Sequence, residues 1–377
     1  MPSPTNVYPW YSPRFWHGMR AGHYAKLLAE GKFRVSPSRW AMAAAIGGFS
    51  VLNSLGWATQ KLFRGKQIDA VRLEHPPLFI IGHWRSGTTL LHEYLVRDPQ
   101  LAFPTTYECF APTHFLMSSA IVPRWFGFVM PARRPMDDMA TGFERPQEDE
   151  FALCALGAPT PYRRVAFPNA PPPCLDFLDM LECDPAERKR FERTLEWFVK
   201  AVTLRAGGRR LVLKSPPHTG RIGTLARLFP GARFVHITRH PYEIFPSTCR
   251  LWRSLDDVQA FDRPRYDEAE LQEYVLTCFE RMYRGFEAQR DEIAPDHLIE
   301  VRYDELIRSP LDTVRLLYDR FGLGDFEGVV PAMREFAGSQ REYRPNRHQL
   351  DPALAEQVRR RWHGYFERYG YDDAIVE

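Results

Sequence analysis

The sequence lacks the motifs that pair cysteines or bind catalytic metals. Its six cysteines stand at positions 109, 154, 174, 183, 249 and 278 and include no C-x-x-C pair, and its twelve histidines include no H-E-x-x-H motif. Neither a disulfide framework nor a zinc site is therefore expected, and the cysteines are predicted to be reduced core thiols. Any catalysis is expected to proceed without a metal.

A strong charge of one sign is also absent. The formal net charge is only +3, and no homeodomain, zinc-finger or RNA-binding signature occurs, so a nucleic-acid partner is not expected. A secretory signal peptide is not expected either, because the chain starts with polar and proline-rich residues that no hydrophobic core follows. These features favour a cytoplasmic location.

The stretch from Leu78 to Val96 has the pattern of an anion cradle. Residues 78–81 form a short apolar run typical of a strand buried on both faces, and residues 82–87 form a turn of mostly small and polar residues. From Thr88 onward apolar residues recur at helical spacing. Such a strand, loop and helix start direct backbone N–H groups and the positive end of the helix dipole at one point, where a phosphate can bind.

The loop lacks the lysine of nucleotide hydrolases. It spells G-x-x-x-x-G-T-T, with Thr88 where the P-loop motif has lysine, and its nearest cation is Arg85. The site still suits a doubly charged group, but it lacks the usual γ-phosphate and magnesium apparatus. A plain glycine turn that joins a strand to a helix is the alternative interpretation.

Two further stretches support a ligand site. Residues 211–214 are a second apolar run that ends in Lys214, and residues 234–238 are a third, followed by Arg239 and, along a predicted helix, by Ser247. A fourth short strand is predicted near residues 297–302. Strands with polar or cationic residues at their carboxyl ends suit an open parallel sheet, where ligands bind beyond those ends.

With these motifs in order, the sequence resembles the sulfotransferases that use the donor PAPS (3′-phosphoadenosine 5′-phosphosulfate), from about residue 78 to about residue 346. The resemblance implies an α/β fold with an open, P-loop-like parallel sheet flanked by helices. The family's R-S-G-T-T loop, as in its bacterial and tyrosylprotein branches, binds the 5′-phosphosulfate, and a strand-end arginine with a later serine holds the 3′-phosphate. The matching residues are Arg85, Ser86, Gly87, Thr88 and Thr89 for the loop and Arg239 and Ser247 for the 3′-phosphate.

The resemblance implies further donor contacts. Lys214 matches the family's strand-end lysine, and together with Arg85 it is expected to act on the bridging and leaving oxygens. Tyr303 matches a tyrosine that commonly lies near the adenine, although a buried structural phenol fits equally. Arg344 and Arg347 belong to a basic loop and are candidates for the donor phosphates.

The general base is less directly indicated. Cytosolic members of the family use a histidine two residues after the lysine, but Pro216 occupies that position here. Other branches use a glutamate beyond the loop arginine, which Glu108 matches, among apolar neighbours that favour proton acceptance. Glu108 is therefore the predicted base, with His218 and His114 in reserve.

The chain is predicted to hold an N-terminal helical extension over residues 1–77 and one sulfotransferase domain over residues 78–377. Within the extension, residues 41–58 are apolar and are followed by basic residues up to position 66. Ser50, Asn53 and Ser54 interrupt this stretch, which favours a helix packed on the domain or lying on a membrane surface over a membrane span.

An acceptor-pocket insertion is predicted over about residues 99–175. Its first part, residues 99–146, is rich in proline and aromatic residues, which suits the walls of a pocket for an apolar or extended acceptor, or an ordinary helical insertion with an aromatic core. The acidic cluster at residues 148–150 is interpreted as a solvated helix end, with substrate positioning as the alternative.

The sequence therefore predicts in-line transfer of a sulfuryl group from PAPS to a hydroxyl or amine, without a metal. It does not choose among small-molecule, lipid, glycan and peptide acceptors or among oligomeric states. The alternatives are a P-loop kinase or NTPase relative and a non-catalytic, membrane-associated nucleotide-binding protein.

Overall fold

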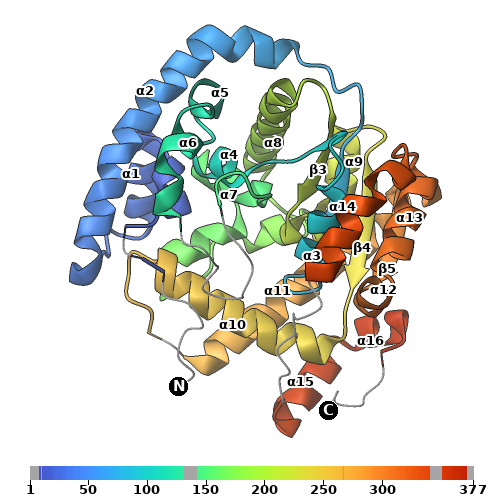
Figure 1. The fold of residues 1–377 in the computed structure, drawn as a ribbon. Helices are drawn as coiled ribbons and strands as arrows, with labels where there is room; N and C mark the ends of the chain where they lie inside the picture. Colours follow the sequence, from blue (N-terminus) through green and yellow to red (C-terminus); the bar gives the residue numbers. More distant parts are fainter. Residues whose placement is uncertain (1–7, 10, 131–141, 266, 340–349, 372–377) are drawn as a thin grey trace.

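A five-stranded parallel sheet forms the centre of the molecule (Figure 1). The computed structural model describes residues 8–9, 11–130, 142–265, 267–339 and 350–371. The strand order is β2-β3-β1-β4-β5, so the strand that precedes the glycine loop is the central one. The strands are β1 (Leu78–Ile81), β2 (Leu101–Ala102), β3 (Arg210–Lys214), β4 (Arg233–Thr238) and β5 (Leu298–Arg302).

Four of the strands lie where the sequence predicts them, and all the pairings are parallel. The fifth, β2, was not predicted, because two residues are too few to show an alternating pattern. All four residues of β1 are fully buried. Since successive side chains point to opposite faces of a strand, Phe79 and Ile81 join one core cluster, whereas Leu78 and Ile80 join the other.

Helices cover both faces of the sheet. The face of Phe79 is covered largely by α8, α10 and α11, and the face of Leu78 by α3, α13 and α14. In chain order the α-helices are α1 (Ala21–Glu30), α2 (Trp40–Ala70), α3 (Thr88–Leu95), α4 (Thr106–Phe110), α5 (Phe115–Ser118), α6 (Val122–Phe126), α7 (Asp149–Ala155), α8 (Pro185–Arg205), α9 (Ile222–Leu228), α10 (Pro241–Gln259), α11 (Glu268–Gln289), α12 (Tyr303–Arg308), α13 (Pro310–Phe321), α14 (Phe326–Ser339), α15 (Pro352–Arg361) and α16 (His363–Tyr369).

The 3₁₀ helices are η1 (Phe15–Gly18), η2 (Pro37–Arg39), η3 (Gly127–Val129), η4 (Pro161–Ala166), η5 (Leu175–Leu178), η6 (Pro216–Arg221), η7 (Arg290–Glu292) and η8 (Pro295–His297). Two of them matter for the site. The η6 turn continues directly from the end of β3, and η4 lies in the segment that connects α7 to α8.

The N-terminal extension is helical, as predicted, and it packs into the main core. Phe15 and Trp16 are almost completely buried and belong to the same cluster as Phe79 of the central strand. The Trp16 indole N–H donates to the carbonyl oxygen of Gln259, 2.7 Å away at the end of α10. The boundary at residue 77 stays a prediction, but the extension and the sheet share one core.

Candidate active site

The glycine loop between β1 and α3 requires unusual backbone conformations. Gly82 and Gly87 have φ angles of +142° and +107°, and a Cβ atom on Gly87 would lie only 2.4 Å from the ring of Tyr303. Arg85 also has a positive φ of +70°, which a non-glycine residue adopts only where its surroundings enforce it. The Ser86 hydroxyl is buried and has no hydrogen-bond partner among the residues that the structure describes. A loop with glycine turns, an unpartnered hydroxyl and a helix start fits a bound anion.

The structure brings the predicted donor residues together. The Arg85 Nε donates to the Ser247 hydroxyl at 2.9 Å, although the two residues are far apart in the chain. Arg239 donates from its Nη1 to the carbonyl oxygen of Arg85 at 3.1 Å. The loop after β1, the end of β4 and helix α10 therefore converge on one cationic point.

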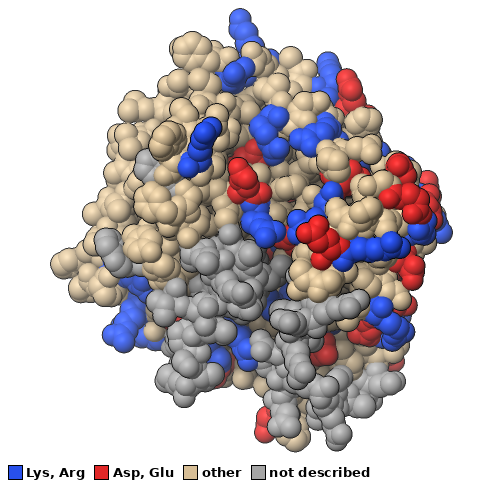
Figure 2. Space-filling view, viewed as in Figure 1, with Lys and Arg blue, Asp and Glu red and all other residues tan. Residues whose placement is uncertain are grey.

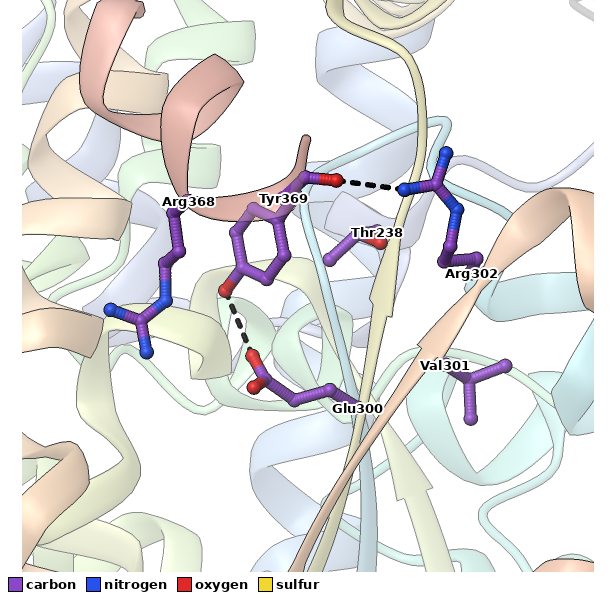
Figure 3. Close-up of a pocket in the computed structure, with 6 residues that line it drawn as sticks. All are labelled: Thr238, Glu300, Val301, Arg302, Arg368 and Tyr369. Carbon is purple, nitrogen blue, oxygen red and sulfur yellow. Dashed lines mark hydrogen bonds between the residues drawn. The ribbon is translucent and has the colours of Figure 1, made fainter. Parts of the chain in front are cut away.

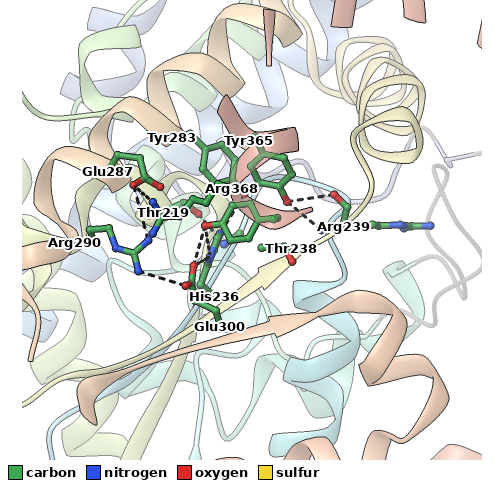
Figure 4. Close-up of polar contacts among 12 residues, drawn as sticks. Thr219, His236, Thr238, Arg239, Tyr283, Glu287, Arg290, Glu300, Tyr365 and Arg368 are labelled. Carbon is green, nitrogen blue, oxygen red and sulfur yellow. Dashed lines mark hydrogen bonds and ion pairs between the residues drawn. The ribbon is translucent and has the colours of Figure 1, made fainter. Parts of the chain in front are cut away.

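The residue Arg239 is held in place from several sides. The hydroxyl of Tyr365 in α16 accepts from the Arg239 N–H at 3.1 Å and lies 3.2 Å from its carbonyl oxygen (Figure 4). The guanidinium pairs with Glu243 at 2.5 Å and lies 4.1 Å above the centre of the Tyr303 ring. Tyr303 thus packs between the loop glycine and Arg239, and its predicted place near the adenine stays a prediction.

Arg250, one helical turn after Ser247 on α10, was not predicted as a site residue. Burial, and then the positive charges of Arg85 and Arg253, lower the pKa of its guanidinium. A cluster of cations on one face is a common feature of anion sites, because it creates a positive potential that attracts the ligand. The sequence did contain a signal for Arg250: it follows Ser247 by three residues, which places the two side chains on the same face of a helix.

The carboxyl end of β3 holds a second polar cluster. The Lys214 ammonium pairs with the Glu148 carboxylate at 2.7 Å, and the second oxygen of that carboxylate accepts from the Tyr162 hydroxyl. Tyr162 in turn accepts from the indole N–H of the loop residue Trp84 at 2.8 Å. Burial and the charge of Glu148 raise the pKa of Tyr162 well above its ordinary value, so its hydroxyl remains a donor. This chain of contacts links the anion loop to Lys214.

The interpretation of residues 148–150 as a solvated helix end is wrong. Asp149 and Glu150 are fully buried, and each carboxylate binds residues of the β3–η6 segment. Asp149 accepts from the Ser215 hydroxyl at 2.8 Å and pairs with the His218 Nε2 at 2.6 Å. Burial alone would raise the pKa of Asp149, but its contacts with His218 and Ser215 lower it below its ordinary value.

Glu150 completes this row of contacts. It forms a two-pronged ion pair with Arg221 at 2.8 and 3.0 Å and accepts from the Thr160 hydroxyl at 2.5 Å. Both members of the ion pair are fully buried. Breaking such a pair leaves a buried charge without a partner, so we assign Glu150 and Arg221 to the framework of the site.

Glu108, the predicted base, makes contacts that stabilise the fold. Its carboxylate pairs with Arg205 at 2.5 and 2.8 Å and also accepts from the backbone N–H of Thr105, as part of a capping box at the start of α4. Its side chain is 2% exposed, whereas that of Glu148 is 14% exposed. The role of Glu108 as base stays a prediction, and the geometry favours Glu148.

The two reserve histidines are also engaged. His218 is fully buried and pairs with Asp149. His114 lies within hydrogen-bond distance of Ser118 at 2.8 Å and of Asn53 at 3.1 Å, and burial lowers the pKa of its imidazole. His114 therefore joins α5 to α2. The other predicted donor residues, Arg344 and Arg347, lie outside the described residues.

A cavity of about 290 Å³ lies at the carboxyl ends of β4 and β5 (Figure 3). Its lining residues are bound to one another: Arg302 donates to the carbonyl oxygen of Tyr369 at 2.7 Å, and the Tyr369 hydroxyl donates to Glu300 at 2.8 Å. Glu300 also lies 3.1 Å from the buried His236. The polar contacts around this cavity join α16 to β5, at the edge of the sheet. Because Tyr365 also lies in α16, we infer that they help to hold Tyr365 against Arg239.

Comparison with known proteins identifies the family. A model of the sulfotransferase family matches residues 76–327, which is more than half of the chain. The chain belongs to the sulfotransferase family. It is 38% identical over 363 residues to proteins named omega-hydroxy-beta-dihydromenaquinone-9 sulfotransferase Stf3 from Mycobacterium bovis and Mycobacterium tuberculosis, a match that covers 96% of this chain and 92% of each relative.

Solved sulfotransferase structures share the fold. STF9 from Mycobacterium avium matches with a TM-score of 0.65 at 17% identity, covering 94% of this chain and 97% of that one. STF1 from Mycobacterium tuberculosis matches with a TM-score of 0.59 at 18% identity, covering 92% and 94%. The predicted α/β sulfotransferase fold is thus confirmed, and the family match with the named relatives supports a sulfotransferase enzyme over the kinase alternative.

The described residues of this sulfotransferase contain no group of three or more histidine, cysteine, aspartate or glutamate side chains placed to hold a metal ion. Metal independence stays an expectation.

The sulfotransferase loop contains one buried imidazole, His83, whose titration should be visible in stability. Its Nδ1 donates to the carbonyl oxygen of Trp84 at 3.0 Å, and its ring contacts Trp84, Phe279 and Trp362. Burial lowers the pKa of His83 to about 3, against the weaker opposing effect of that hydrogen bond. The folded state therefore disfavours protonation of His83 relative to the unfolded chain.

We predict that His83 makes the protein less stable as the pH falls from 6.5 to 5. The contribution of neutral His83 to folding stability is fully present above its pKa in the unfolded chain, about 6.5. It is lost as the pH falls towards its lower pKa in the folded protein, because over this range the unfolded chain binds a proton that the folded protein does not. Across this interval His83 should account for roughly 1.5 kcal/mol of the change in unfolding free energy. Urea unfolding at each pH should show that change reduced by this amount in His83→Phe. An identical pH dependence in the variant would contradict the assignment.

Proposed function

We propose that this sulfotransferase transfers the sulfuryl group of PAPS to the hydroxyl of a membrane lipid of the isoprenoid-quinone class. The choice of PAPS as donor is supported by the convergence of Arg85, Ser247 and Arg239 at the glycine loop. The acceptor class is suggested by the name of the relatives, which describes sulfation of a hydroxylated dihydromenaquinone.

The donor would be held by the residues that form the cationic point. The loop N–H groups and the Ser86 hydroxyl suit the 5′-phosphosulfate, and Arg239 with Ser247 suits the 3′-phosphate. Charge-assisted hydrogen bonds from guanidinium groups are the strongest protein contacts to phosphate. PAPS supplies an activated sulfuryl group, and the chain supplies orientation and charge stabilisation.

An apolar acceptor is supported by the aromatic residues beside Glu148. Phe151 follows in α7, and its ring centre lies 5.1 Å from that of Tyr162 and 6.1 Å from that of Phe110. Phe110 and Phe151 are both partly exposed. A carboxylate next to partly exposed aromatic rings suits an acceptor that presents one hydroxyl on an apolar body.

Glu148 is the residue that we assign as general base. During transfer the acceptor oxygen forms a bond to sulfur, the bond from sulfur to the phosphate oxygen breaks, and the hydroxyl proton passes to the Glu148 carboxylate. Lys214 and Tyr162 each donate a hydrogen bond to one oxygen of that carboxylate, and the two bonds fix its orientation. Arg85, in the loop, and Lys214, at the end of β3, are the cations that we place near the developing negative charge on the departing oxygen.

Replacement of Glu148 should separate catalysis from donor binding. In Glu148→Gln we expect kcat to fall by roughly 10²- to 10⁴-fold, because the amide cannot accept the proton. Affinity for PAP (3′-phosphoadenosine 5′-phosphate) should change little. Steady-state kinetics and calorimetric titration with PAP measure the two quantities.

The matched control is Glu108→Gln. Since Glu108 caps α4 and pairs with Arg205, this change should lower thermal stability while kcat of the folded protein is retained. Full activity in Glu148→Gln together with an inactive but folded Glu108→Gln would return the base to Glu108.

The 3′-phosphate contact is tested by Arg239→Ala. Loss of a charge-assisted contact should weaken PAP binding by about 2 kcal/mol, or about thirtyfold, in calorimetric titration. Arg227→Ala is the control, because Arg227 is 54% exposed and pairs with Glu292 on the surface. Tighter binding of ATP with magnesium than of PAP would refute the proposed donor, and unchanged PAP affinity in Arg239→Ala would remove Arg239 from the site.

A further inference from the structure

Helix α2 exposes an unusually apolar outer surface. Seven of its large apolar side chains are at least half exposed, although soluble proteins seldom leave so many together in water. Figure 1 shows α2 running along one side of the molecule, and Figure 2 shows that side with few charged atoms. The exposed residues are Trp40 (63%), Phe49 (51%), Val51 (54%), Leu52 (61%), Leu55 (62%), Leu62 (78%) and Phe63 (64%).

The short helices next to α2 extend this surface. Ile121, Trp125 and Phe128, in and beside α6 and η3, are 58%, 69% and 77% exposed. Exposed tryptophan and phenylalanine are typical of segments that enter the boundary between lipid headgroups and acyl chains. We call α2 together with residues 117–129 the α2–α6 surface.

The opposite side of α2 is fastened to the protein by polar contacts. The Asn53 side-chain amide donates to the backbone carbonyl oxygens of His17 and Met19 at 2.5 and 2.9 Å, and the Gln60 side-chain Oε1 accepts from the backbone N–H of Leu116 at 2.9 Å. Gln60 is fully buried and Asn53 is 4% exposed. A helix that crossed a bilayer would have to break these contacts and place the amides in lipid, at a high cost.

By length and composition the helical stretch 37–70 could span a membrane, and since only 17% of its most apolar window is buried inside the protein, it is not a core helix. The polar contacts favour a helix that lies flat, with its apolar face outward.

The charges at the two ends of the apolar part of α2 are mostly positive, and Asp69, in the last turn, is the one acidic residue of the helix. Residues 31–68 contain no aspartate or glutamate, and their cations stand before and after the apolar part of α2. Such an arrangement complements anionic phospholipid headgroups, each nearby cation contributing on the order of 1 kcal/mol to membrane attraction. These cations are Lys32, Arg34, Arg39, Lys61, Arg64 and Lys66, and Arg124 adds one more in α6.

We propose that the α2–α6 surface docks this sulfotransferase on a bilayer that contains anionic phospholipid, without spanning it. The biological role of this docking rests on the proposed function, because the surface is where a lipid acceptor would pass from the bilayer to the enzyme. The surface lies close to the site: the hydroxyls of Ser118 in α5 and Tyr107 in α4 are 2.7 Å apart, and α4 packs against α7, which Glu148 precedes. A lipid leaving the bilayer at this surface therefore has a short way to the base.

Vesicle sedimentation tests the proposal. The full chain should bind vesicles of phosphatidylglycerol and phosphatidylcholine more tightly than vesicles of phosphatidylcholine alone, and high salt should weaken the binding. The variant Leu52→Glu/Leu55→Glu/Leu62→Glu should lose about tenfold or more in its partition coefficient. The control Ile307→Glu/Leu316→Glu changes side chains that are 50% and 45% exposed on α12 and α13, across the molecule from α2, and should bind like the unchanged protein.

Several results would overturn the proposal. They are no binding to anionic vesicles, equal binding by the triple variant, or resistance of the bound protein to alkaline carbonate, which would show a membrane span. Activity separates this inference from the proposed function: the triple variant should still sulfate a short-chain, water-soluble quinone alcohol. If the unchanged protein binds vesicles as described but transfers no sulfuryl group from PAPS, the docking surface stands and the proposed function fails.

Discussion

The attachment of three consecutive carboxylates to the end of strand β3 is the contact on which the site depends. Glu148, Asp149 and Glu150 bind in turn to Lys214, to Ser215 with His218, and to Arg221. Buried carboxylates are costly unless each has a matching partner, so this row permits essentially one arrangement of the insertion on the sheet. It fixes the aromatic residues of the proposed acceptor side relative to Lys214 of β3, and through Tyr162 and Trp84 it also reaches the anion loop.

The proposed donor side is fixed in a comparable way. Arg239 binds the carbonyl oxygen of Arg85 with its side chain and the Tyr365 hydroxyl with its backbone. The loop after β1, the end of β4 and the C-terminal helix α16 therefore form one unit. The positive φ of Arg85 is maintained by these neighbours, which is how a strained residue persists at a functional site. The two halves meet at the carboxyl ends of the adjacent strands β3 and β1, so the proposed donor and acceptor groups can lie close together.

Much of the fold and of the geometry of the candidate donor site was predictable because its signals are local. The apolar runs that become β1, β3, β4 and β5, the glycine loop, and the strand-end cations are all read from short stretches of sequence. The approach of Arg239 to Arg85 follows once the strands are known to be parallel, since the carboxyl ends of β1 and β4 share one edge.

The remaining features depend on partners that sequence spacing does not reveal. Glu148 and Lys214 are 66 residues apart, and Arg239 and Tyr365 are 126 apart, so neither contact leaves a local pattern. The burial of the acidic cluster was missed for that reason. The structural role of Glu108, in contrast, could have been read from the sequence. Thr105 and Glu108 form the T-x-x-E pattern of a capping box, which predicts a structural carboxylate at the start of a helix.

The central claim is that the 85–89 loop, Arg239 with Ser247, and the Lys214–Glu148 pair form a single transfer site. A crystal structure of the protein with PAP tests it most directly. We expect the 5′-phosphate on the loop N–H groups, the 3′-phosphate on Arg239 and Ser247, and the Glu148 carboxylate facing the open side of the 5′-phosphate. A nucleotide bound elsewhere, or one bound with Glu148 turned away from its 5′-phosphate, would contradict the account.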